Sequence, residues 1–250
     1  MATPRAATAA LLRQLRRARP SATRQSLRAA TATPPTHARL SSTFSSVNAE
    51  EISHFNGLAA SWWDPHGSSR LLHLMNPLRH DFIRACQAST ADAPPPSSAA
   101  TARYLDVGCG GGIFAESAAR LPTTASVTAI DPSPEVVEHV DSPAEFLARC
   151  APFVKPGGWL VGSTIARTWV SWLTTNFLAE DVLGIVPKGT HDWNKYINDA
   201  ELTAWFAGQS GWASPRIMGV VYVPGVGWRE VAGSEKVGNY FFAFRREIAA

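Results

Sequence analysis

A short apolar stretch that runs into three alternating glycines constrains the fold of this chain more than any other feature. Residues 104–107 read as a buried strand, Gly108, Gly110 and Gly112 as a sharp turn, and residues 113–121 as a helix. Glycine permits such a turn and lets a ligand approach the backbone N–H groups. Asp131 follows the next apolar run, where nucleotide-binding folds place a carboxylate on ribose hydroxyls. The sequence therefore predicts an α/β fold with a ligand at this turn.

Two classes of ligand compete for the turn. Gly110-x-Gly112-x-x-Ala115 matches a dinucleotide fingerprint, which is a weak signal by itself. The longer pattern Asp106-x-Gly108-x-Gly110-x-Gly112 resembles motif I of S-adenosylmethionine-dependent methyltransferases. A turn that only ends a strand is a third interpretation, although three glycines lower chain stability unless a ligand requires them. Asp106, two residues before the first glycine, favours S-adenosylmethionine over a nicotinamide cofactor.

Charge is distributed unevenly along the chain. The 250 residues carry a formal net charge of +3, but residues 1–39 contain eight arginines and no acidic residue, so the remainder carries −5. An acidic folded part argues against nucleic acid as a partner. Three cysteines without paired metal spacing indicate a reducing compartment. No apolar run approaches the length of about eighteen residues that spans a bilayer.

Residues 1–45 are predicted to lie outside the folded domain, which comprises residues 46–250. They are rich in Arg, Ser and Ala and potentially amphipathic, which is typical of a mitochondrial transit peptide. A disordered basic tail that binds an acidic partner is the alternative interpretation.

The remaining elements follow from caps and apolar periodicity. We expect a helix from Asn48 to Trp62 and another that begins at Asn76, with Pro77 in its first turn and Leu78, Phe82 and Cys86 on its buried side. A capping box at residues 142–145 predicts a helix, residues 159–163 a strand and residues 199–207 a helix. Strands at 216–223 and 239–246 are predicted to form an antiparallel end of the sheet.

The run from Thr168 to Pro187 is rich in tryptophan and aliphatic residues, among them Trp169 and Trp172. Such a composition suits a membrane interface that collects a lipid-tailed substrate. A buried cap over the active site is the alternative, because amphipathic stretches are usually part of a core.

Several motifs, taken in order, sharpen the resemblance to one family. They are Trp62-Trp63-Asp64-Pro65, Asn76-Pro77-Leu78-Arg79, the glycine turn, Glu135-Val136-Val137-Glu138-His139, Lys155-Pro156-Gly157-Gly158 and residues 186–193. Over residues 48–246 the chain resembles the ubiquinone-biosynthesis O-methyltransferases. The resemblance implies methylation of polyprenylated catechols by a mitochondrial enzyme peripheral to the matrix side of the inner membrane, within a ubiquinone-biosynthesis protein complex.

Methyl transfer to a catechol needs an oxyanion beside the sulfonium methyl, and a divalent cation can ionise the phenol. Glu135, Glu138 and His139 share one face if their stretch is helical. Without the family, Glu135 and Glu138 are more simply interpreted as acidic residues at a helix start. The resemblance implies that they bind Mg²⁺ or another divalent cation, and His139 could instead be the general base. For the cofactor, it implies Arg79, Asp106, Gly108, Gly110 and Asp131.

The chain departs from the family directly after Asp131. Residues 132–134 join it to Glu135, whereas the family places two helices and two strands between the ribose carboxylate and the Glu-x-x-Glu-His motif. About fifty to sixty residues of core are missing, at roughly thirty per strand–helix–strand unit. We expect an unpaired edge on the first strand, an open adenine pocket, low stability and weakened or absent cofactor binding. A skipped or mispredicted exon is the simplest hypothesis.

The resulting prediction is a Rossmann-like class I methyltransferase sheet with helices on both faces that lacks two core strands. Two other functions stay open. One is a non-catalytic scaffold in the biosynthetic complex, and the other is a methyltransferase that acts on another small molecule.

Overall fold

The computed structural model describes residues 62–64, 66–67, 69–90, 101–131, 142–182 and 191–248. Its contacts divide the chain into residues 1–42 and 43–250, and every described residue belongs to the second unit. The predicted transit peptide, and the predicted helix from Asn48 up to residue 61, lie outside the described residues.

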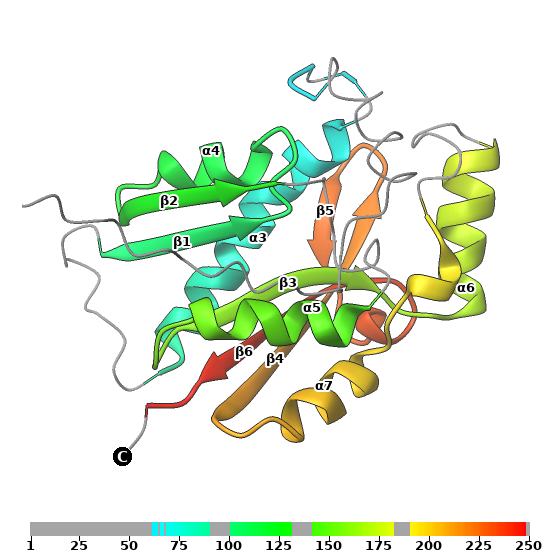
Figure 1. The fold of residues 1–250 in the computed structure, drawn as a ribbon. Helices are drawn as coiled ribbons and strands as arrows, with labels where there is room; N and C mark the ends of the chain where they lie inside the picture. The colour runs from blue at the N-terminus through cyan, green and yellow to red at the C-terminus, as the bar shows by residue number, and fades with distance from the viewer. Residues whose placement is uncertain are drawn as a thin grey trace, which may run out of the picture. The chain divides into compact units, whose positions relative to one another are not determined.

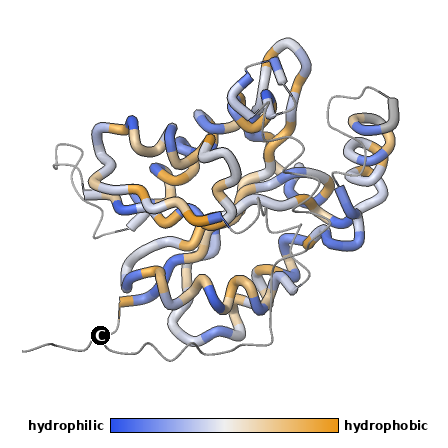
Figure 2. The backbone as a smooth tube through the Cα atoms, turned by 45° about the horizontal axis from the view of Figure 1, so that its top comes forward, coloured by the Kyte–Doolittle hydropathy of each residue, from blue (hydrophilic) through white to orange (hydrophobic). Residues whose placement is uncertain are grey.

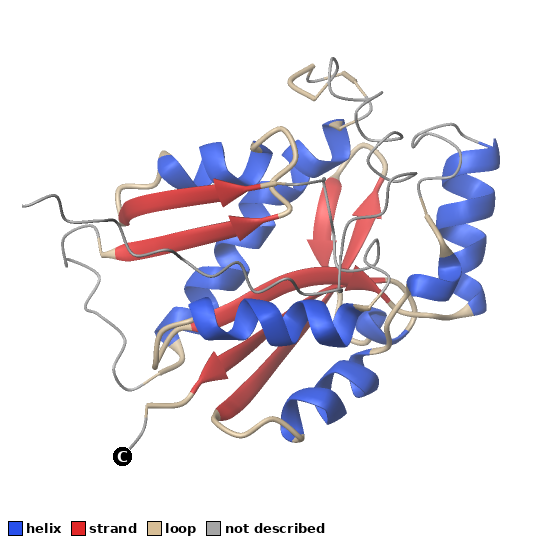
Figure 3. Ribbon diagram, viewed as in Figure 1, coloured by secondary structure: helices blue, strands red, loops and turns tan. Residues whose placement is uncertain are grey.

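The described strands form two sheets (Figures 1 and 3). β1 (Ala102–Val107) and β2 (Thr124–Ile130) pair in parallel, with α4 (Ile113–Ala119) as the crossover between them. The second sheet has the order β3-β6-β4-β5, with every neighbouring pair antiparallel. Its strands are β3 (Trp159–Ile165), β4 (Trp212–Val223), β5 (Gly227–Glu230) and β6 (Asn239–Arg246).

The separation into two sheets agrees with the predicted loss of core strands. Among the described strands, β1 pairs only with β2, and β3 pairs only with β6. Each of these two strands therefore has one edge without a partner in the described part of the chain. The β1–β2 unit keeps its parallel register from Arg103↔Ser126 to Val107↔Ile130. The expected unpaired edge of the first strand is thus confirmed within the described residues.

Side-chain alternation along β6 explains why helices cover both faces of the second sheet. Tyr240, Phe242 and Phe244 point to one face, where they pack against α5 (Pro143–Cys150) and α7 (Asp199–Ala207). Phe241 and Ala243 point to the other face and pack against α3 (Arg70–Ala88). Hydrophobic positions alternate with hydrophilic ones along these helices (Figure 2), as expected for elements with one buried face.

Helix α3 links the two sheets. On one side it contacts α4, and on the other it contacts β3, β5 and β6.

The helix begins at Arg70, not at Asn76, so Pro77 lies inside it. Asn76 is not a cap, because its buried side-chain amide donates to the Ile113 carbonyl at 3.0 Å. Burial of Met75 and of Phe82 offsets the hydrogen bond that Pro77 cannot make.

Other predicted elements are confirmed with shifted ends. The strands of residues 216–223 and 239–246 pair antiparallel, but β5 lies between them in the sequence and pairs with β4, which the sequence did not predict. The helix after Ser142 is present without a side-chain hydrogen bond from Ser142. The tryptophan-rich run forms α6 (Trp169–Trp172), which continues as the π-helical segment η4 (Leu173–Val182).

Candidate functional site

The glycine turn has the backbone geometry that its sequence predicts. It follows Val107 at the carboxyl end of β1, and Gly108, Gly110 and Gly112 have φ angles of 73°, 52° and 79°. Side chains with a Cβ rarely adopt such angles, so glycine is required at these positions. Gly112 directly precedes α4. The turn therefore connects the end of a strand to the start of a helix. Its Gly108 amide donates to the Ile130 carbonyl at 2.9 Å and its Gly112 amide to the Cys109 carbonyl at 2.8 Å.

Asp106 places a half-buried carboxylate beside the turn. Burial raises its pKa above the ordinary value of 3.8, whereas the positive charge of Arg79 and a hydrogen bond from the Ala115 backbone act in the opposite direction. Its Oδ2 atom is buried and has no hydrogen-bond partner among the described residues. An unpaired buried carboxylate oxygen is costly. A cationic donor on a ligand would satisfy it, so the site fits a sulfonium cofactor with a free amino group.

Asp131 lies at the carboxyl end of β2, adjacent to the same turn. Its carboxylate accepts a hydrogen bond from the backbone amide of Gly110. Its charge also contributes to the raised pKa of Asp106. The structure thus brings together the five residues that the sequence singled out for the cofactor. The predicted partner of Asp131 was a ribose hydroxyl, whereas here it binds the turn itself.

Trp62 is part of this site, which the sequence did not predict. Its ring packs over the glycine turn, and a Cβ built on Gly110 would lie 1.9 Å from the ring atoms Cη2 and Cζ3. The side chain is only 8% exposed. His73 of α3 holds the Trp62 backbone, with Nε2 donating to its carbonyl at 2.7 Å. The sequence predicts Trp62 only as the last residue of a helix, and the motif Trp62-Trp63-Asp64-Pro65 is the signal that could have revealed its role.

The predicted metal ligands Glu135, Glu138 and His139 lie outside the described residues. In the part of the chain that the structure describes, no three His, Cys, Asp or Glu side chains form a group that could hold a metal ion. The metal site and the role of His139 therefore stay predictions.

A second polar cluster, also missed from the sequence, joins η4 to the residues after it. Glu180 is buried, and its Oε1 accepts from the backbone amide of His191 at 2.8 Å and lies 2.6 Å from His191 Nδ1. Asn176 Nδ2 donates to the His191 carbonyl at 2.6 Å. The signal that could have revealed it was a carboxylate, Glu180, in a run with few charged residues.

The tryptophan-rich run exposes part of its aromatic surface. Trp169 is 72% exposed and Trp172 48% exposed, and the Trp172 ring stacks on Phe177 with centroids 6.3 Å apart. This exposure favours an interface over a fully buried cap. No helix that the structure describes is both long and apolar enough to cross a membrane.

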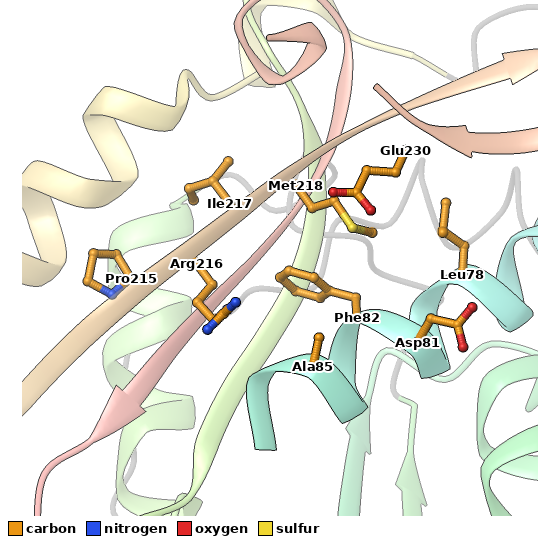
Figure 4. Close-up of a pocket in the computed structure, with 9 residues that line it drawn as sticks. All are labelled: Leu78, Asp81, Phe82, Ala85, Pro215, Arg216, Ile217, Met218 and Glu230. Atoms are coloured by element: carbon orange, nitrogen blue, oxygen red, sulfur yellow. The ribbon is translucent and has the colours of Figure 1, made fainter. Parts of the chain in front are cut away.

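A cavity of about 530 Å³ lies between α3 and strands β4 and β5 (Figure 4). Phe82 and Met218 are among its apolar lining residues, and Asp81, Arg216 and Glu230 are its charged ones. None of the predicted site residues lines it.

Known proteins match both the turn and the chain as a whole. Residues 105–138 match the family model described as a methyltransferase domain. The mitochondrial ubiquinone biosynthesis O-methyltransferase of Schizosaccharomyces pombe is 38% identical, over 82% of this chain and 89% of the relative. That of Candida albicans is 36% identical over 80% and 86%, and the ubiquinone biosynthesis O-methyltransferase of Methylobacterium nodulans is 35% identical over 82% and 97%.

The chain belongs to the ubiquinone-biosynthesis O-methyltransferase family. It carries a methyltransferase domain, and the glycine turn lies within the matched residues. S-adenosylmethionine is the cofactor that such a domain indicates, and the dinucleotide interpretation of the turn is set aside.

The alignments contain positions that this chain lacks. The alignment with the Candida albicans relative runs over 281 positions, more than the 250 residues of this chain. The Schizosaccharomyces pombe alignment runs over 252 positions but covers 82% of this chain, or about 205 residues, so about 47 positions lack a counterpart here. The Candida albicans alignment covers 80% of this chain, or about 200 residues, so about 81 of its positions lack a counterpart here. The two numbers lie on either side of the expected fifty to sixty residues.

Proposed function

We propose that this chain catalyses S-adenosylmethionine-dependent O-methylation of a polyprenylated catechol in ubiquinone biosynthesis. The observation that carries the proposal is the turn with three positive-φ glycines at the end of β1, flanked by carboxylates at the ends of two adjacent parallel strands. Ligands of open α/β folds bind outside the carboxyl ends of the strands. Family membership supports the reaction class.

The residues at the turn would each meet a different part of the cofactor. Bound S-adenosylmethionine supplies an electrophilic methyl group on a positively charged sulfur. The unpaired Oδ2 of Asp106 would accept from its amino group, and the Arg79 guanidinium would pair with its carboxylate. Asp131 would exchange the Gly110 amide for the ribose hydroxyls. Gly108 and Gly110 would line the methionine end, where the lack of a Cβ lets the cofactor approach the backbone.

The phenol must lose its proton before it attacks the methyl group. Glu135, Glu138 and His139 are proposed to hold Mg²⁺ or another divalent cation, which would bind the catechol oxygens and favour the phenolate. His139 as the general base remains the alternative role for that residue. A chelator should therefore abolish turnover of the prenylated catechol if the cation is required.

The location of the enzyme is proposed from residues 1–45 and from two exposed tryptophans. The arginine-rich residues 1–45 would direct the chain to mitochondria, as the names of the fungal relatives suggest. Exposed Trp169 and Trp172 would contact the matrix side of the inner membrane, where a polyprenylated substrate resides. Membership of a ubiquinone-biosynthesis complex follows from the family resemblance alone.

A non-catalytic scaffold is the second candidate, and specific contacts favour it. The Trp62 ring covers Gly110 and Gly111, and Asp131 already binds the amide of Gly110. Both groups occupy positions that a cofactor would need. Two core strands are also missing from the sheet beside the turn.

Calorimetry with S-adenosylmethionine on the full chain separates the candidates. The wild-type protein and Trp62→Ala are titrated, with Asp131→Ala as the binding-deficient variant and exposed Glu230→Gln as a matched carboxylate control. Micromolar binding that Asp131→Ala weakens at least tenfold supports the enzyme. Binding only by Trp62→Ala shows a competent site covered by the indole. No binding by either protein supports the scaffold.

Radiolabelled methyl transfer identifies the acceptor. Label incorporated into a prenylated catechol, and not into unrelated phenols, supports the proposed substrate class. Transfer only to another small molecule would favour the third interpretation, a methyltransferase outside ubiquinone biosynthesis.

A further inference from the structure

The Glu180–His191 cluster holds an imidazole in a defined orientation. His191 Nδ1 lies 2.6 Å from Glu180 Oε1, and the Glu180 side chain is only 3% exposed. The His191 ring also meets the ring of Tyr196 edge to face, with centroids 6.4 Å apart. Tyr196 is itself fully buried, and its hydroxyl lies 2.7 Å from Thr175 Oγ1. The orientation of the imidazole is therefore set from the side of Nδ1.

The other ring nitrogen is left available. The His191 side chain is 17% exposed. No described residue makes a hydrogen bond to its Nε2. A carboxylate bonded to Nδ1–H keeps the proton of a neutral imidazole on Nδ1, so that Nε2 carries the lone pair. The arrangement resembles the base-and-orienting-carboxylate pair that proton-abstracting enzymes use.

The cluster follows the carboxyl end of β3. The segment after His191 packs against the residues that follow β3, because Trp193 Nε1 donates to the Thr168 carbonyl at 2.8 Å and the Ile197 amide donates to the Ile165 carbonyl at 3.0 Å. The glycine turn and Asp131 likewise follow the carboxyl ends of β1 and β2. Polar groups at this edge of an open α/β fold are the ones that meet substrate.

We infer that His191 is the general base that removes the phenolic proton of the acceptor, and that Glu180 is its positioning residue. This inference rests on the proposed O-methylation. The phenol O–H bond breaks and its proton passes to Nε2, while the oxygen forms a bond to the methyl carbon. The methyl carbon–sulfur bond breaks and leaves its electron pair on sulfur. The carboxylate of Glu180 stabilises the resulting imidazolium, which later releases the proton to water.

A purely structural role would tie η4 to the loop after it and would affect every acceptor alike. The test therefore compares two acceptors, a prenylated catechol and 4-nitrocatechol, whose more acidic phenol is already ionised near neutral pH. His191→Gln should lower kcat on the prenylated catechol by about 100-fold or more, the usual contribution of a general base. It should lower kcat on 4-nitrocatechol by less than about tenfold. Glu180→Gln should show the same acceptor dependence with a loss of up to about 100-fold.

A second readout needs neither cofactor nor turnover. 4-Nitrocatechol is titrated with the full chain at mildly acidic pH in the presence of a chelator, and phenolate absorbance is recorded. The wild-type protein and the matched control His66→Gln, which changes an exposed histidine, should increase the absorbance, and His191→Gln should not. Equal absorbance with His191→Gln, or equal kcat losses on both acceptors, would overturn the inference. Failure to bind S-adenosylmethionine would instead refute the proposed function, while the absorbance result still decides the role of His191.

Discussion

Replacement of Gly110 by alanine tests whether the Trp62 indole covers the turn. Gly110 has φ 52°, and its new Cβ would lie 1.9 Å from two ring atoms of Trp62. Gly112 has φ 79°, but nothing lies within 4 Å of a Cβ built there, so Gly112→Ala is a matched control. Both substitutions impose a left-handed backbone on alanine, at a cost of about 1–2 kcal/mol. Only Gly110→Ala must also displace the indole.

Displacement of packed atoms adds about 1–3 kcal/mol. Gly110→Ala should thus lower the free energy of unfolding by about 2–5 kcal/mol, against about 1–2 kcal/mol for Gly112→Ala. In a Trp62→Ala background the cost of Gly110→Ala should fall to that of the control, a coupling of about 1–3 kcal/mol. Urea titrations of the five proteins measure these values. Equal costs at the two glycines, or a coupling below about 0.5 kcal/mol, would refute the placement of the indole over the turn.

Three further outcomes follow from burial and exposure. Burial raises the pKa of Asp106, so the folded state holds its proton more tightly than the unfolded state does; the free energy of unfolding of Asp106→Asn, relative to wild type, should therefore rise as the pH increases from below 3.8 to neutral in denaturant titrations. Burial raises the pKa of the Cys86 thiol to about 11, so a thiol reagent at pH 8 should label Cys86 only after unfolding. The control is Cys86→Ser, which should take up as much label as the wild-type protein in the native state and less after unfolding. Replacement of both Trp169 and Trp172 by serine should weaken binding to anionic vesicles at least tenfold in a sedimentation assay with unchanged circular dichroism, and unchanged binding would contradict a membrane role.

Local patterns predicted the part of the fold in which neighbours in sequence are neighbours in space. The strand, turn and helix of residues 102–119 form as expected, because glycine is the residue that adopts the positive φ angles between them. α7 and β6 were predicted with the bounds that the structure shows. The start of α3 was wrong, because Asn76 and Pro77 have the local pattern of a helix start, whereas tertiary burial of Met75 extends the helix through them.

The candidate site was also predicted only in part, because sequence patterns group residues at the ends of consecutive strands but not residues that meet through tertiary packing. Asp106, Asp131 and Gly110 could be grouped from the sequence, because consecutive parallel strands end at one edge of the fold. The Glu180–His191 pair could not, because its members lie 11 residues apart and no local pattern predicts that they meet. Trp62 could not be placed on Gly110 either, since the two residues are 48 positions apart in the sequence and come together only in the folded chain, where His73 of α3 bonds the Trp62 carbonyl.

The order of residues alone predicted a glycine turn with two carboxylates, the family to which the chain belongs, and the loss of a core segment after Asp131. The tertiary structure decided which groups lie next to these residues. Because no strand in the described residues bridges β1 and β3, the sheet is divided, and α3 holds its parts together. Packing then brings the Trp62 indole over the glycine turn and sets His191 against Glu180. Such contacts depend on distances across the folded chain, which spacing along the sequence does not encode.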